Sequence, residues 1–350
     1  MTEASLDAAL HRRGWPRPGA LTVMALALVG VMLFAIGAGR FEIGWGRIVA
    51  ILAARALDPL GSPETMDARI VELVRLPRLL LAALCGAGLA VGGAALQGVF
   101  RNPLVSPQVL GISQGGAFGG ALAILLGLSG VWLLGLSFGF GLMALLLVGV
   151  LARIDGRTEI LTVILAGMIV GAFFAALVSV LQVLADPNSS LPAIVYWLMG
   201  SFSTATWPRL GLAAPGLAAG LLLLWLMRYR LNLLALDDAE ARSLGVRPER
   251  ERWIVFAAVA LMTGASVAVA GVIGWIGLVL PHAARLIVGE DHRALIPASA
   301  LLGAAYLTLI DTLARTLTAA EIPLGVLTAL IGAPVFAILL RRVLRERARA

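Results

Sequence analysis

The chain has 350 residues, of which 60% are hydrophobic and 13% are charged, and its formal net charge is +7. Soluble globular domains carry about 25% charged residues, so this composition excludes that class and indicates an integral membrane protein. The basic residues stand in loops between apolar runs, as the positive-inside rule expects, and they do not indicate nucleic-acid binding.

Two residue types limit the chemistry. All 27 basic residues are arginine. A P-loop needs a lysine on the nucleotide phosphates, so we do not expect the chain to bind ATP in that manner. Cys85 is the single cysteine and the three histidines are far apart in sequence, which predicts no disulfide framework, no metal site and no cofactor.

The apolar runs predict an all-α polytopic protein with about ten transmembrane helices. Arginines before the first run would also fit a signal peptide, but its length and the many later runs favour a membrane helix. Both termini are then cytoplasmic, with a polar lead at 1–19, one transmembrane domain at 20–343 and a basic tail at 344–350. The expected spans are 20–38, 79–100, 111–127, 131–151, 160–185, 210–226, 253–272, a short eighth ending near Pro281, 294–313 and 326–340.

Charged residues on the expected outer side are unusual. The loop at 39–75 carries several arginines and ends in Arg75 and Arg78, although basic residues are disfavoured there. An acidic partner outside the membrane would explain them. Asp311 is the one acidic residue predicted inside an apolar span, and Arg315 follows at i,i+4, where it can neutralise the carboxylate. Glu321, in an outer turn, either meets a partner or caps the last helix.

The stretch at 97–116 breaks the helical pattern with two prolines and several glycines. Irregular polar backbone near membrane depth is tolerated where it is buried or lines a water-filled cavity. We therefore interpret it as a candidate gate rather than a plain connecting loop. Its candidate pathway residues are Gln97, Asn102, Leu104, Ser113 and Gln114.

The stretch at 231–246 is polar and too highly charged to span a membrane. Its pattern predicts a helix with an apolar side, and Gly245 is a plausible stop. Arginines on both flanks place it in the cytoplasm. A short cytoplasmic helix that exposes apolar residues needs a partner, so we expect it to dock a soluble subunit.

Several motifs in this order give the chain a specific resemblance. From Arg75 to about Leu340 the sequence resembles the FecCD family, the permease subunits of bacterial ABC importers for iron–siderophore complexes, haem and cobalamin. The matching stretches include RLPR from Arg75, QGVFRNPL from Gln97, LGIS from Leu110, LNLL from Leu231, AEARSLG from Ala239, GLVLPHAAR from Gly277, DTLAR from Asp311, EIPLGVLT from Glu321 and IGAP from Ile331.

The resemblance implies a homodimer around a central pathway in the bacterial inner membrane, with two copies of a separate ATPase below and an extracytoplasmic binding protein above. Asn102 and Leu104 match the family's cytoplasmic gate, and a second gate element should lie near 160–162, where the match is poor. The docking arginines would be Arg75, Arg78 and Arg315. The coupling helix, at about 237–246, would contact the ATPase through Asp238, Glu240, Ala241, Arg242, Leu244 and Gly245; Asp237 stands where the family usually has glycine.

Other functions remain open at this point. An ion-coupled secondary transporter needs ionisable groups within the membrane, and Asp311 is the one candidate. A structural scaffold leaves the gate-like break unexplained. The cargo would be an iron–siderophore chelate by resemblance, with haem and cobalamin as alternatives, and the sequence selects none of them.

Overall fold

The computed structural model describes residues 19–58, 61–154, 157–318 and 320–347, and nearly all of its regular structure is helical. Seven helices in this part of the chain are long and apolar enough to cross a membrane, and three shorter apolar helices bring the total to the expected ten. The ten are α2 (Ala20–Gly37), the continuous Met66–Val99 unit, α6 (Ile112–Leu125), α7 (Val131–Leu151), α8 (Ile160–Leu184), α10 (Trp207–Leu226), α13 (Pro248–Ala270), α14 (Ile276–Val288), α15 (His292–Thr316) and α16 (Leu324–Arg347).

The smaller elements connect these helices. They are α3 (Trp45–Leu57), the 3-10 turn η2 (Pro107–Leu110), the two-residue strands β1 (Arg153–Ile154) and β2 (Arg157–Thr158), α9 (Ser190–Leu198), α11 (Arg228–Leu234) and α12 (Asp238–Ser243). The strands pair antiparallel, with Arg153 opposite Thr158. Helix α9 lies in the connection between α8 and α10.

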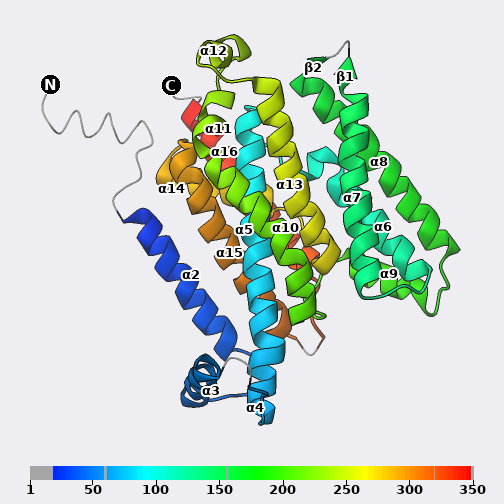
Figure 1. The fold of residues 1–350 in the computed structure, drawn as a ribbon, viewed down its shortest axis with the longest axis vertical. Helices are drawn as coiled ribbons and strands as arrows, with labels where there is room; N and C mark the ends of the chain where they lie inside the picture. Colours follow the sequence, from blue (N-terminus) through cyan, green and yellow to red (C-terminus); the bar gives the residue numbers. More distant parts are fainter. Residues whose placement is uncertain (1–18, 59–60, 155–156, 319, 348–350) are drawn as a thin grey trace, which may run out of the picture.

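Three helices make the centre of the bundle. In its most apolar window the Met66–Val99 unit is 83% buried, α13 is 78% and α15 is 61%, whereas α2 is only 17%. Figure 1 shows α5 running through the middle with α13 and α15 beside it. The outer helices keep apolar side chains exposed, as lipid-facing helices do.

Glycines allow the central helices to touch through their backbones. A Cβ on Gly86 would lie 2.2 Å from the Gly303 carbonyl oxygen of α15, and one on Gly93 would lie 1.9 Å from that of Gly277 in α14. In lipid there is no hydrophobic driving force between helices, so helices associate through the close packing of small residues. Gly86 and Gly93 therefore serve helix packing.

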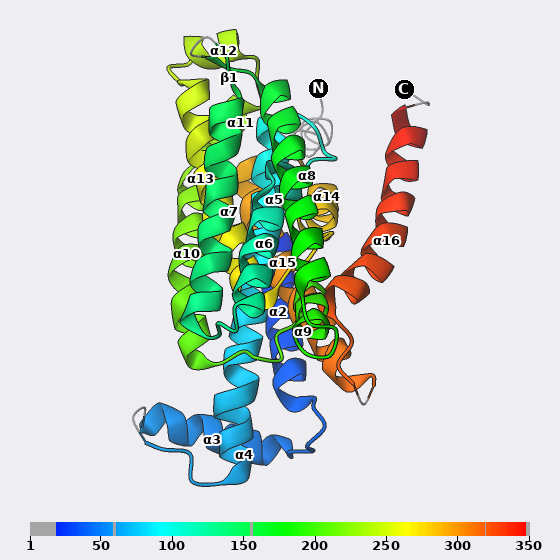
Figure 2. The same ribbon diagram turned by 90° about the vertical axis from the view of Figure 1, so that its right-hand side faces the viewer.

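The loop predicted at 39–75 is largely helical, so that prediction was wrong. Helix α3 lies crosswise beneath the bundle (Figure 2), and the second span begins at Met66 through α4 (Met66–Arg69) and a π-turn, η1 (Ile70–Arg75). Pro77 sits in the first turn of α5 (Leu76–Val99) and cannot donate a backbone hydrogen bond. A π-turn immediately before it lets the helix continue through a position where proline normally ends one.

The polar stretch at 231–246 was predicted as one helix and is in fact two. The break falls at Ala235, Leu236 and Asp237, and Asp237 is extended (φ −66°, ψ 150°) at the start of α12. Gly245 has φ +81°, the left-handed conformation expected of a helix stop. Helix α12 lies at the end of the bundle opposite α3 (Figure 1).

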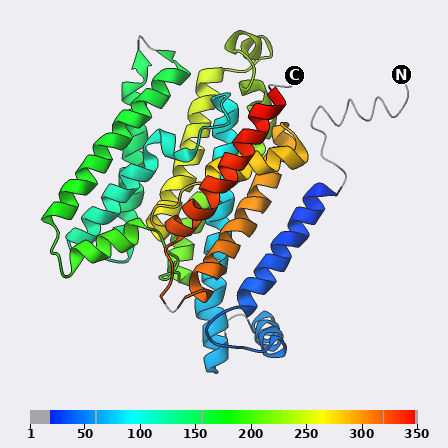
Figure 3. The ribbon, with the colours of Figure 1, turned by 180° about the vertical axis from the view of Figure 1, so that it is seen from behind.

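Helix α16 stands apart from the layer formed by α7, α10 and α13 (Figure 2), and it crosses in front of α14 and α15 when the molecule is seen from behind (Figure 3). Leu330 is 66% exposed and Ile338 67%. The helix continues to Arg347, so the predicted start of the tail at 344 falls within it. Of the predicted lead at 1–19, residues 1–18 lie outside the described part, as do residues 348–350 of the tail.

Candidate functional site

Gln97 organises the predicted gate. It is buried near the end of α5, and its Nε2 lies 3.3 Å from the Val105 carbonyl oxygen and 3.4 Å from that of Gly277. Its Oε1 accepts from Arg285 Nη2 of α14 at 3.1 Å. One amide thus joins the α5 end, the following loop and α14.

The loop after α5 places Asn102 and Leu104 together. The Asn102 N–H donates to the Gln97 carbonyl at 3.1 Å, and the Asn102 Oδ1 accepts from the Leu104 N–H at 2.9 Å. Both side chains are exposed at the α12 end. Ser113 is buried and Gln114 is half-buried in the first turn of α6, beyond η2. In the second expected gate element, at 160–162, Thr162 is half-buried in the first turn of α8.

One side of helix α12 is bonded to the bundle, and the other side is exposed. Ala241 is buried, while Glu240, Arg242, Leu244 and Gly245 are exposed. Asp238 accepts hydrogen bonds from Arg252 of α13 and Arg101 of the gate loop. The bond from Arg252, with the charges of Arg252, Arg101 and Arg242, holds the pKa of Asp238 below its ordinary value despite partial burial. An apolar and charged surface therefore remains available on this helix.

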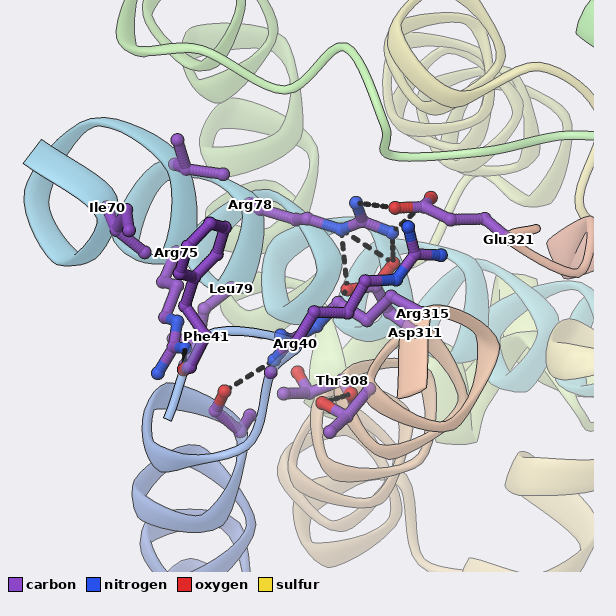
Figure 4. A pocket seen from close by; sticks show the side chains of 14 residues that line it. Arg40, Phe41, Ile70, Arg75, Arg78, Leu79, Thr308, Asp311, Arg315 and Glu321 are labelled. Carbon is purple, nitrogen blue, oxygen red and sulfur yellow. Dashed lines mark hydrogen bonds and ion pairs between the residues drawn. The ribbon is translucent and has the colours of Figure 1, made fainter. Parts of the chain in front are cut away.

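At the α3 end, three predicted docking arginines line one cavity of about 160 Å³ (Figure 4). Arg78 is buried and makes paired hydrogen bonds to Asp311 (2.8–3.1 Å) and Glu321 (2.9 Å). Asp311 and Arg315 lie 3.9 Å apart, so the main partner of Asp311 is Arg78, not the i,i+4 arginine expected from sequence.

The other two arginines cap helix α2. Arg75 donates to the carbonyls of Ile36, Gly37 and Phe41 at 2.6–3.0 Å. Arg315 donates to the carbonyls of Ala35 and Ala38 at 2.5 and 2.7 Å. The bonds to Ala35, Ile36 and Gly37 satisfy carbonyls that a helix leaves open at its C-terminus, and those to Ala38 and Phe41 hold the segment that follows. Arg40, on the rim of the same cavity, is exposed.

Sequence reasoning missed two of these relationships. The sequence indicates a cytoplasmic turn at Arg101, directly before Asn102, but it does not predict the contacts of Arg101 with α12. The partner of Asp311 was missed because Arg78 lies 233 residues away. Within the described residues, no group of three or more His, Cys, Asp or Glu side chains could hold a metal ion.

Comparison with known proteins identifies the family. The model of the FecCD transport family matches residues 26–342. This chain belongs to the FecCD family. It is an ABC importer permease and a multi-pass inner-membrane protein, and relatives of this kind are transport components rather than catalysts. The ion-coupled and scaffold alternatives are therefore set aside.

Relatives of this FecCD chain have different named cargoes. It is 43% identical over 335 residues, 94% of this chain and 97% of the relative, to the molybdate import system permease of Haemophilus influenzae. It is 41% identical to an iron chelatin transport system permease of Helicobacter pylori, over 78% of this chain and 82% of the relative. A solved structure described as an inward-facing conformation of a metal-chelate type ABC transporter matches with a TM-score of 0.84 and 40% identity, over 93% of this chain and all of that one.

Proposed function

We propose that this chain is half of a homodimeric permease whose α12 faces the cytoplasm and docks a separate ATPase. The observation that supports it is the asymmetry of α12: Asp238 is anchored to the bundle, while Glu240, Arg242 and Leu244 point away from any described neighbour that would bury them. A surface of this kind needs a partner. With ten spans, both termini lie on the cytoplasmic side.

The test is gentle purification of the tagged permease from its native membranes, with mass spectrometry of what accompanies it. We expect an ATP-binding subunit in near-equal amount. Leu244→Asp should reduce its recovery, because a charge replaces an exposed apolar contact. Asn188→Asp, which adds a charge in the exposed connection before α9, is the control. Equal ATPase recovery with Leu244→Asp would contradict the assignment of α12.

We further propose that the binding protein docks at the α3 end, over the cavity lined by Arg75, Arg78 and Arg315. Support comes from the gathering of these arginines with exposed Arg40 at one opening. Since Arg75 and Arg78 are buried and already bonded, Arg40 is the better site for the first substitution. Arg40→Glu should weaken the stimulation of ATP hydrolysis by the binding protein and leave basal hydrolysis unchanged; Arg69→Glu, also exposed at this end, is the control. Unchanged stimulation would count against docking at this opening.

The identity of the cargo is the most specific part of the proposal. The resemblance alone favours an iron–siderophore chelate, but the molybdate permease matches 94% of this chain. That coverage makes molybdate the first cargo to test. Metal uptake by cells with and without the permease, supplied with molybdate, a ferric siderophore, haem or cobalamin, separates the four. Accumulation of iron but not molybdenum would instead support an iron–siderophore chelate as the cargo.

A further inference from the structure

Arg101 is the side chain that ties the gate loop to α12. Its Nη1 lies 2.5 Å from Asp237 Oδ1, its Nη2 donates to the Leu236 carbonyl, and Nη2 lies 3.4 Å from Asp238 Oδ1. All three partners fall in the break before α12 or on its first residue. The break thus coincides with the point where α12 is held.

The backbone of Arg101 is also unusual. Its φ is +50°, and among the described non-glycine residues only Trp275 shares a positive value. L-residues rarely adopt this conformation, so the surrounding contacts must hold it. On one side the Phe100 ring stacks on Phe256 of α13 at 5.6 Å, and on the other Asn102 bonds to Gln97. These contacts hold the backbone on both sides of Arg101.

The loop beyond Arg101 is internally braced. Asn102 is bonded to both Gln97 and Leu104, and Gln97 also reaches Val105. A displacement of Arg101 would consequently shift Asn102 and Leu104 as one unit.

The contacts on α12 divide between two arginines. Arg252, whose side chain is 7% exposed, fixes Asp238 to α13. Asp237, with its side chain 84% exposed, forms an ion pair with Arg101. Arg252 therefore anchors α12 to the bundle, while the Arg101–Asp237 pair leads to the gate. This also gives a role to Asp237.

We propose that Arg101 is a positioning residue that transmits displacement of α12 to the loop carrying Asn102 and Leu104. The inference rests on the proposed function, in which an ATPase moves α12. The alternative is that Arg101 only stabilises the contact between this loop and α12 and transmits no movement. Exposed ion pairs contribute little to global stability, so removing Arg101 should leave the fold and the ATPase contact intact.

The test uses the accessibility of the gate and needs no knowledge of the cargo. Cys85 is the single cysteine and is buried, so a Leu104→Cys variant carries one exposed thiol. In membranes holding the full complex, we measure its alkylation rate by maleimide with ADP and with ATP plus vanadate. We expect the rate to change about five-fold or more with the nucleotide, and Arg101→Gln to abolish the change while ATPase recovery stays normal.

Two further variants make the result decisive. Arg228→Gln, at a half-buried arginine of α11 that donates to the Trp225 carbonyl, should behave like the parent. Exchanging the charges as Arg101→Asp with Asp237→Arg should restore part of the response that Arg101→Asp alone loses. A full nucleotide response in Arg101→Gln would overturn the inference and leave the proposed function standing. No nucleotide response in the parent, with no ATPase recovered, would overturn both.

Discussion

Arg78 and Asp311 lie 233 residues apart in sequence and form a doubly hydrogen-bonded ion pair between α5 and α15, with Nε–Oδ2 at 3.0 Å and Nη2–Oδ1 at 2.8 Å. Their side chains are 10% and 4% exposed. Glu321, from the turn before α16, completes the arrangement on the other edge of the same guanidinium. One arginine therefore joins three segments at the α3 end.

Removing Arg78 should strongly destabilise the bundle. Arg78→Gln leaves two carboxylates without their cation, and breaking a buried pair costs roughly 3–5 kcal/mol. We expect a clearly lower melting temperature in detergent. Arg78→Met combined with Asp311→Leu should melt at a higher temperature than Arg78→Gln. The double variant removes the buried carboxylate of Asp311 together with its cation. A double variant less stable than the single one would contradict this account.

The glycine contacts predict a contrast within one protein. Gly86→Ala forces a methyl group into the Gly303 carbonyl, and overpacking of this kind costs about 1–3 kcal/mol. Gly139→Ala in α7 meets nothing within 4 Å and should be neutral or slightly stabilising. Melting temperatures of the two purified variants are the measurement. Equal values would mean that α5 and α15 can separate without loss.

Helix α2 should depend on its two capping arginines. Only 17% of its apolar window is buried, so bonds from Arg75 and Arg315 to carbonyls of its last turn help to attach it. Arg315→Gln should raise amide hydrogen exchange in the last turn of α2 and in the segment at 38–44. Arg40→Gln, at an exposed arginine within the segment at 38–44, is the matched control. A rise in amide hydrogen exchange confined to α15 would argue against the capping of α2 by Arg315.

Asp291 predicts a specific pH dependence. Burial alone would raise its pKa, but hydrogen bonds from Arg293 and Asn232 outweigh this, and the pKa lies below its ordinary value. A lowered carboxylate pKa stabilises the fold fully above the unfolded value of about 3.9 and loses that contribution as the pH falls through the folded value. The melting-temperature gap between the parent and Asp291→Asn should stay constant from about pH 7 to 5 and close below about pH 4. A gap that closes already near pH 6 would assign the effect to another group.

The ten apolar helices, the FecCD motifs and the positions of the candidate residues could be predicted from the amino-acid sequence, because hydropathy and motif spacing are local properties of the chain. The break at Asp237, the helix within 39–75 and the partner of Asp311 were not predictable in this way. Each depends on which groups packing brings together: Arg101 meets the Leu236 carbonyl from 135 residues away, and Arg78 reaches Asp311 only after α5 and α15 make contact. The tertiary structure alone decided that Arg75 and Arg315 cap α2, since the open carbonyls of a helix end accept whichever donors the fold places beside them.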